Sequence, residues 1–506
     1  MNIADKAIFN ILSQSSGTIL LLLSSIVYVR FLSQADYGTF LQVMLISNTV
    51  IMLGFLGLPQ SIYYFFQTEE KKDVFVLRTL VITALLSVFF AVALLLLKTT
   101  LVRVFDNPDL AKNYWAVWLI VLAGYLIRLR EPLLWSAEKL VLSGLLTLVA
   151  SLLQFGLPVA GLFWGGTVRH VLLFMVAGNA ICLLIHLPVF GLMVRDLRRK
   201  RIAEVASSSE SAGRKPVGFW QQMRYAIPIG LSSYSGVIGR EMDKYIISGW
   251  FNPAQFAIYS RGALEVPLIS TIRFTINDIM MPKFVQLFKG GQYDELFDKW
   301  HQIIEHVAKI NCGVFALLFA LTPTMIRILY TEAYMGAVPV FRTYLFMLLI
   351  GVAVYGMLPR VSGQTRLVLW ASLLNLPLNF VLAIVLIPWV GPVGPAASTV
   401  IASAVTMLWL LNCSKGLVNR PLSKMFPWRR LGGILLIAVI SSVPIYIVET
   451  LCATSGLVSL GAVAGELMVY LLTYLILLQR YHFLSDEEKT TLCRWLRPLP
   501  LGFILQ

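Results

Sequence analysis

Long apolar runs alternate with short polar segments along almost the whole chain. Each run approaches the roughly 20 apolar residues that an α-helix needs to cross the ~30 Å hydrocarbon core of a bilayer. The runs are continuous, as from Leu20 to Val29, rather than alternating with period two, which favours helices over strands. The pattern predicts an all-α membrane protein with about fourteen transmembrane helices, at 8–32, 40–66, 77–97, 114–135, 141–164, 171–194, 225–250, 256–282, 303–329, 337–358, 367–389, 395–414, 431–449 and 457–479.

Composition supports a membrane protein, and the charge indicates how it is oriented. The 506 residues are 58% hydrophobic and only 13% charged, whereas soluble domains average about 25% charged residues. If the N-terminus is cytoplasmic, the basic residues fall mainly in inner segments. The outer segments then carry only Arg30, Lys98, Arg103, Lys112 and Arg169. We therefore expect both termini in the cytoplasm, and we assign the net charge of +15 to topology rather than to a nucleic-acid partner. The first run is too long for a signal peptide and should remain in the mature protein.

Polar segments divide the chain into expected domains. The segment 196–224 is basic and then rich in serine and alanine, which is typical of a flexible linker. It separates a six-helix lobe at 1–195 from a second six-helix lobe at 225–417. Two further helices occupy 418–480, and an amphipathic cytoplasmic tail follows at 481–506. The expected fold is two pseudo-symmetric lobes with two C-terminal helices.

A weak internal repeat supports the two lobes. The segment FLSQADYGTF (31–40) follows the first run, and WFNPAQFAIY (250–259) follows the seventh. Their alanine and aromatic positions match at a constant offset of 219 residues. Such repeats, with a substrate site between them, are characteristic of secondary transporters.

Charged residues interrupt the apolar runs unevenly. The first six predicted spans contain almost none. The span 225–250 contains Arg240, Glu241, Asp243 and Lys244, and the next contains Arg261, Glu265, Arg273 and Asp278. The following two spans add Glu305, Lys309, Arg327 and Arg342. A charge at the bilayer centre costs at least ~2.5–3.5 kcal/mol on insertion scales, so these side chains should face a partner or a polar cavity.

Three interpretations of these charges remain open. Counted at 1.5 Å per residue along the two spans, Asp243 lies at a depth similar to that of Arg261, and Arg240 at a depth similar to that of Glu265. These matching depths predict ion pairs across a helical hairpin. Alternatively, Arg240, Lys244, Arg261 and Arg273 line a cavity and bind phosphate, because guanidinium and ammonium groups suit phosphate oxygens. In the third interpretation, Glu241, Asp243, Glu265 or Asp278 couples transport to an ion or to the membrane potential, because burial promotes protonation of a carboxylate.

Five short motifs, in order and spacing, resemble a known family. They are RFL (30–32), ADYG (35–38), GLPQ (57–60), PIGL (228–231) and DKYIIS (243–248). The chain resembles bacterial polysaccharide and O-antigen flippases of the multidrug/oligosaccharidyl-lipid/polysaccharide exporter superfamily. The resemblance implies alternating access and an undecaprenyl-pyrophosphate-linked oligosaccharide as cargo, moved to the periplasmic leaflet of the inner membrane for O-antigen, capsule or exopolysaccharide synthesis. It also implies membrane lipids and the polysaccharide polymerase machinery as partners.

Two features narrow the function further. Lipid II flippases, which are relatives, carry arginines within the first helix, but Ala7 to Val29 contains none; this argues against lipid II as cargo. The five cysteines and five histidines form no ligand cluster, and no nucleotide or hydrolase motif occurs, so we expect neither a cofactor nor catalysis. The alternatives are a multidrug/cation antiporter of the same superfamily and a membrane glycosyltransferase or polymerase.

Aromatic residues gather at the expected inner end of the second span. Tyr63, Tyr64, Phe65 and Phe66 are consecutive there. Aromatic rings at this depth usually anchor a helix at the membrane interface, and the alternative is that they stack against sugars. The sequence does not separate the two interpretations.

Overall fold

The computed structural model describes residues 3–207, 217–264, 266, 269–418, 420–452, 460–484 and 488, and the described chain is almost entirely helical, with no strand among these residues. The predicted all-α class is confirmed. The chain forms two compact units, 1–257 and 258–506, and α11 (Pro253–Gly262) crosses the boundary.

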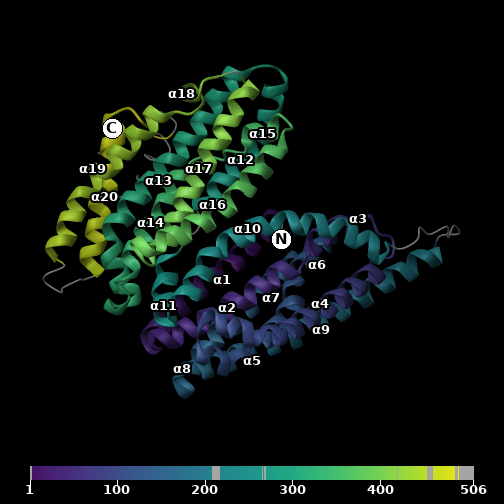
Figure 1. Ribbon diagram of the computed structural model, residues 1–506. Coiled ribbons are helices and arrows are strands. Elements are labelled where there is room, and N and C mark those ends of the chain that lie inside the picture. The colour runs from purple at the N-terminus through teal and green to yellow at the C-terminus, as the bar shows by residue number, and fades with distance from the viewer. Residues whose placement is uncertain are drawn as a thin grey trace. The chain divides into compact units, whose positions relative to one another are not determined.

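Unit 1 is a bundle of long helices (Figure 1). Its helices before α11 are α1 (Ile3–Phe31), α2 (Gln34–Gly54), α3 (Leu58–Thr68), α4 (Lys72–Phe105), α5 (Pro108–Arg128), α6 (Arg130–Ser136), α7 (Leu140–Ser151), α8 (Leu157–Gly165), α9 (Val168–Ser207) and α10 (Phe219–Trp250). A π-helical turn, η1 (Leu152–Gly156), joins α7 to α8. Helices α4, α5 and α9 pack side by side, and α2 packs on α5.

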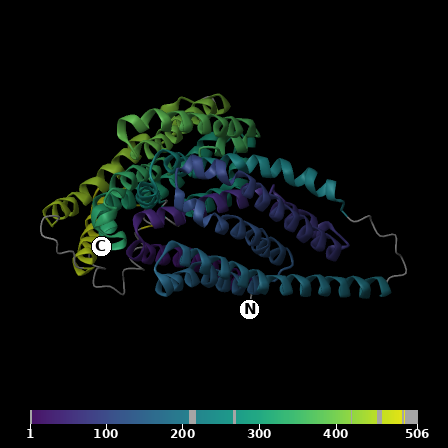
Figure 2. The same ribbon diagram turned by 60° about the horizontal axis from the view of Figure 1, so that its bottom comes forward.

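Helix α9 is longer than a membrane span requires. Its 40 residues correspond to about 60 Å at 1.5 Å per residue, and it is a long, straight helix in Figure 2. The helix includes residues 196–207, for which the sequence predicted a flexible linker. Arg201 lies 3.1 Å from Asp73 and Lys139 lies 3.5 Å from Asp196, so these ion pairs join the helical extension to the rest of unit 1. Residues 208–216 of the expected linker lie outside the described residues.

Unit 2 contains the remaining helices, and α13 is in contact with α12, α14, α19 and α20. The helices are α12 (Ile269–Lys289), α13 (Tyr293–Tyr330), α14 (Ala337–Ile350), α15 (Met357–Val361), α16 (Thr365–Val390), α17 (Val393–Val418), α18 (Leu422–Met425), α19 (Trp428–Cys452) and α20 (Leu460–Arg480), with a 3₁₀ turn, η2 (Glu332–Tyr334). Trp300 and Phe297 are each 1% exposed in an apolar core that α13 shares with α12 and α19.

Eleven helical segments among the described residues are long and apolar enough to cross a membrane. The chain is therefore a multi-pass membrane protein. The predicted spans 225–250, 256–282 and 337–358 correspond to α10, to α11 with α12, and to α14 with α15, none of which is among the eleven. The count of fourteen is thus not established. Large apolar side chains on α4, such as Leu85 and Leu96, are exposed, as expected for a surface that faces lipid.

The internal repeat has a structural counterpart. Ser33 accepts a hydrogen bond from the backbone N–H of Asp36, and Asn252 accepts one from Gln255. Both side chains cap the start of a helix, and the two capping residues are 219 positions apart, as the matching motif residues are. The same local structure therefore begins α2 and α11.

Candidate functional site

Helix α10, which carries four of the predicted site residues, is attached to unit 1 near both of its ends. Near its start, the Gln222 amide donates to the hydroxyls of Ser61 and Thr79, each at 3.1 Å. Near its end, Ser248 accepts a hydrogen bond from Gln42 at 2.9 Å. All five side chains are fully buried. Unsatisfied polar groups would be costly there, so these hydrogen bonds fix the position of α10 against α2, α3 and α4.

The four charged residues of α10 lie between these attachments. Arg240 is exposed and Asp243 is 3% exposed. The Lys244 ammonium lies 2.9 Å from the Glu241 carboxylate, one turn earlier, with both side chains about a quarter exposed. Lys244 lies six residues, about 9 Å along the helix, before the C-terminal end of α10. Its charge is thus partly balanced by Glu241, a partner that the sequence analysis did not assign.

The other predicted residues belong to unit 2. Arg261 is 9% exposed, and its guanidinium lies 5.7 Å from the centre of the Tyr330 ring, a cation–π distance. Arg273 is half-buried, and its guanidinium occupies the space that a side chain at Gly351 would need. Glu265 lies outside the described residues, as does the side chain of Asp278. The expected ion pairs Asp243–Arg261 and Arg240–Glu265 stay predictions.

Three further cations of the charged spans have protein partners within unit 2. Arg327 lies 3.4 Å from Glu332. Arg342 donates to the carbonyl of Phe319 at 3.0 Å, and its guanidinium also lies over the ring of that residue. The third, Lys309, belongs to a larger polar network.

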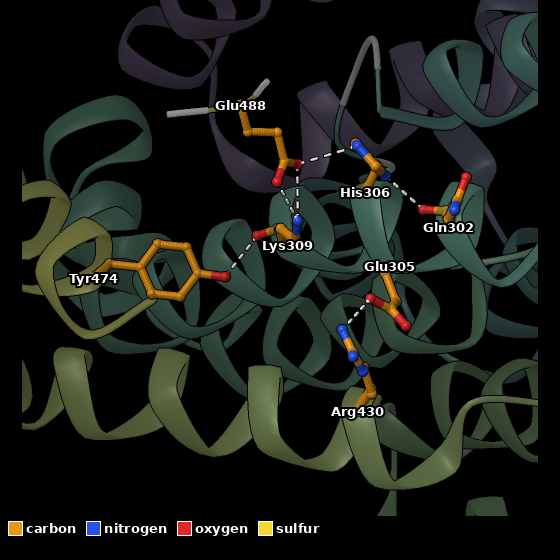
Figure 3. A network of polar contacts seen from close by, with 7 residues as sticks. All are labelled: Gln302, Glu305, His306, Lys309, Arg430, Tyr474 and Glu488. Carbon is orange, nitrogen blue, oxygen red and sulfur yellow. Dashed lines mark hydrogen bonds and ion pairs between the residues drawn. The ribbon is translucent and has the colours of Figure 1, made fainter. Parts of the chain in front are cut away.

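Figure 3 shows this network along one face of α13. The Lys309 ammonium donates to both oxygens of Glu488 at 2.6 and 2.8 Å. His306 lies 3.3 Å from the same carboxylate, and the Tyr474 hydroxyl donates to the Lys309 carbonyl at 2.7 Å. One turn earlier, Glu305 and Arg430 form an ion pair at 3.1 Å. The network joins α13, α19, α20 and the tail, so these charges hold unit 2 together. Most of the predicted amphipathic tail lies outside the described residues.

We expect Glu488→Ala to destabilise the protein by about 3–5 kcal/mol, because the buried Lys309 ammonium would lose its counter-ion. Thermal unfolding of the purified protein measures this loss. Lys309→Met in the same chain should restore most of it. Glu295→Ala, which removes the carboxylate from an exposed pair with Lys299, should cost at most about 1 kcal/mol. Equal melting temperatures for Glu488→Ala and Glu295→Ala would refute the structural role of the tail.

Charged residues also lie within the bounds of one candidate span of unit 1. The candidate span Pro108–Ser136 continues through α6, so Arg128, Arg130 and Glu131 lie within it. The sequence analysis predicted this span at 114–135 and counted its arginines as cytoplasmic, and that placement stays a prediction. No group of three or more His, Cys, Asp or Glu residues in the described ranges could hold a metal ion.

Comparisons with known structures agree on the fold. The lipid II flippase MurJ, in an inward closed conformation, is 15% identical and matches with a TM-score of 0.70 over 94% of this chain and 98% of that chain. A multidrug resistance MATE family transporter of the MOP superfamily, in an inward-facing conformation, is 12% identical, with a TM-score of 0.58 over 82% of this chain and 99% of that chain. At these identities the likeness establishes the fold alone.

Sequence comparison establishes the family. No curated protein sequence matches the chain. The family model described as "Polysaccharide biosynthesis protein" matches residues 3–288, which is more than half of the chain and includes α1 to α11, with every predicted site residue. The chain therefore belongs to the polysaccharide biosynthesis protein family, with the fold of the MOP-superfamily transporters.

Proposed function

We propose that the protein is a flippase, not an enzyme, that moves an undecaprenyl-pyrophosphate-linked oligosaccharide repeat unit from the cytoplasmic to the periplasmic leaflet of the bacterial inner membrane. The product supplies O-antigen, capsule or exopolysaccharide synthesis. The family match over residues 3–288 is the observation that carries the proposal. The fold supports it, because one protein that shares this fold is a lipid II flippase.

The cations of α10 and unit 2 are the proposed contacts for the pyrophosphate. A diphosphate that leaves water needs compensating positive charge, and Arg240, Lys244, Arg261 and Arg273 are the proposed groups. Of these, Arg240 is exposed, and so is the most accessible to a ligand. The lobes 1–195 and 225–417 would open alternately to the two sides of the membrane, with both termini in the cytoplasm. Contact with the polysaccharide polymerase machinery is part of the same proposal.

The carboxylates Glu241, Asp243, Glu265 and Asp278 are the proposed coupling groups. Asp243 is 3% exposed, and a carboxylate removed from water is the kind of group that binds a proton or a cation during transport. Rates that do not change with pH, sodium or membrane potential would exclude a coupling role for all four.

A multidrug antiporter is the second candidate, because a MATE transporter shares the fold. Complementation separates the two functions. Expression in a strain that lacks its polysaccharide flippase should restore surface polysaccharide, whereas expression in a drug-hypersensitive strain should leave drug tolerance unchanged. Drug resistance without polysaccharide rescue would reverse the assignment.

A further inference from the structure

A row of polar and aromatic contacts joins α2 and α3 to α5 and α6 within unit 1. The Arg128 guanidinium donates to the Asn48 amide oxygen at 2.8 Å. Further along the same pair of helical segments, the rings of Tyr63 and Trp135 lie 6.5 Å apart. Below, "the inner seam" denotes Asn48, Tyr63, Arg128, Glu131 and Trp135. The inner seam lies in the candidate spans Gln34–Thr68 and Pro108–Ser136.

Arg128 is exposed and lies within the bounds of a candidate span. Eight residues, about 12 Å of helix, separate it from the end of α6 at Ser136. A guanidinium at this position of a candidate span is stable when it faces water, headgroups or a polar pathway rather than lipid tails. Within the described ranges, no carboxylate lies at ion-pair distance from Arg128, and its hydrogen-bonding partner Asn48 is neutral. Its remaining N–H groups are suited to an anionic ligand.

The rest of the inner seam has the chemistry of a sugar site. Tyr63 is 42% exposed, so part of its ring is free to contact a ligand, and Trp135 beside it is half-buried. Glu131 lies within electrostatic range of Tyr63 and 3.5 Å from Arg130. Aromatic faces stack on apolar sugar faces, and a carboxylate accepts hydrogen bonds from hydroxyl groups.

The separation between Arg128 and Trp135 suits a single ligand that carries both a diphosphate and a sugar. Seven residues, roughly 10 Å of helix, separate Arg128 from Trp135. That length accommodates a diphosphate at one end and its first sugar at the other. The seam's five side chains carry one cation and one anion, so recognition depends on their arrangement rather than on net charge.

We propose that the inner seam binds the head of a polyprenyl-diphospho-sugar, with Arg128 on the diphosphate and Tyr63, Trp135 and Glu131 on the adjacent sugar. The residues of this site differ from the cations proposed at 240–273, and the inference rests on the proposed function. A second kind of ligand could also bring a phosphate group to Arg128, namely a phospholipid headgroup. A sugar-dependent contribution from Trp135 distinguishes the two kinds of ligand.

The experiment measures binding to purified full-length protein in phosphatidylcholine nanodiscs. The probes are farnesyl diphosphate and farnesyl-diphospho-N-acetylglucosamine, with phosphatidylglycerol as competitor. Arg128→Ala should weaken both probes by about ten- to a hundredfold, since one charge-assisted contact is lost. Trp135→Leu should weaken only the sugar-bearing probe, by about fivefold or more. Phosphatidylglycerol at equal concentration should not displace either probe.

Controls keep structural damage distinguishable from lost binding. Arg103→Ala removes an exposed arginine from the other end of unit 1 and should leave both affinities unchanged. Thermal unfolding of each variant confirms that it is folded.

Three outcomes would overturn the inference. Arg128→Ala could bind both probes normally, Trp135→Leu could weaken both equally, or phosphatidylglycerol could compete as well as the diphosphates. If instead the wild-type protein bound neither probe, the proposed function itself would fail. The two failures are therefore distinguishable.

Discussion

A chain in which Arg240, Lys244, Arg261 and Arg273 are all replaced by alanine is expected to insert into the membrane and to export no polysaccharide. The physical reason is the diphosphate, whose charge cannot leave water without compensating cations. Loss of four charge-assisted contacts should reduce transport by several orders of magnitude. Surface polysaccharide in a flippase-deficient strain measures the effect, and membrane-fraction abundance measures insertion.

The matched control removes the same formal charge elsewhere. Four exposed cations lie in segments predicted to face outward: Lys98, Arg103, Lys112 and Arg169. Their joint replacement by alanine should leave export intact, because it lowers charge only in those predicted outer segments and so preserves the positive-inside bias. Full export by the first variant, at normal abundance, would refute the assignment of those four residues to the cargo.

Gly57→Ala is expected to cost about 2–5 kcal/mol of stability and to reduce the yield of folded protein. Gly57 has a φ of +75°, a conformation that costs other residues roughly 1–2 kcal/mol. A β-carbon there would also lie 2.2 Å from the carbonyl oxygen of Ala226 and 2.7 Å from the backbone nitrogen of Gly230. Both contacts belong to the backbone of α10, so neither can move aside cheaply. The substitution should separate α10 from the turn between α2 and α3.

Gly363 provides the control for Gly57. Its φ is +76°, but no described atom outside its immediate neighbourhood lies within 4 Å of the position that a β-carbon would take. Gly363→Ala should therefore cost only the roughly 1–2 kcal/mol of stability that comes from its backbone conformation. Melting temperatures of the two purified variants measure the difference, and a Gly57→Ala protein as stable as Gly363→Ala would contradict the close packing of α10.

Hydrophobic patterning predicted much of this structure, because a span must be long, apolar and helical. The capping pair Ser33 and Asn252 shows that a repeat visible only as a short motif corresponds to a real local structure. The linker was predicted less well. Residues 196–207 are polar but continue α9, where the ion pair of Arg201 with Asp73 supports the helix, and such tertiary contacts cannot be derived from composition.

The charged residues show what sequence reasoning could predict and what it could not. It identified the interruption at Arg240 to Lys244, because charges within an apolar run are visible directly. It could not pair Lys309 with Glu488, since the two residues are 179 positions apart. It placed Arg128 in the cytoplasm although the predicted span 114–135 includes this residue, because composition does not show where along a helix the membrane ends.

The central claim is that this protein moves a lipid-linked oligosaccharide across a bilayer. Its most direct test is reconstitution of the purified protein in liposomes that carry fluorescent undecaprenyl-pyrophosphate oligosaccharide, with movement between leaflets followed by quenching from outside. The account predicts rapid access of the quencher to substrate from both leaflets with wild-type protein, and access to only the outer half with the fourfold alanine variant. Equal quenching in wild-type and protein-free liposomes would contradict the account.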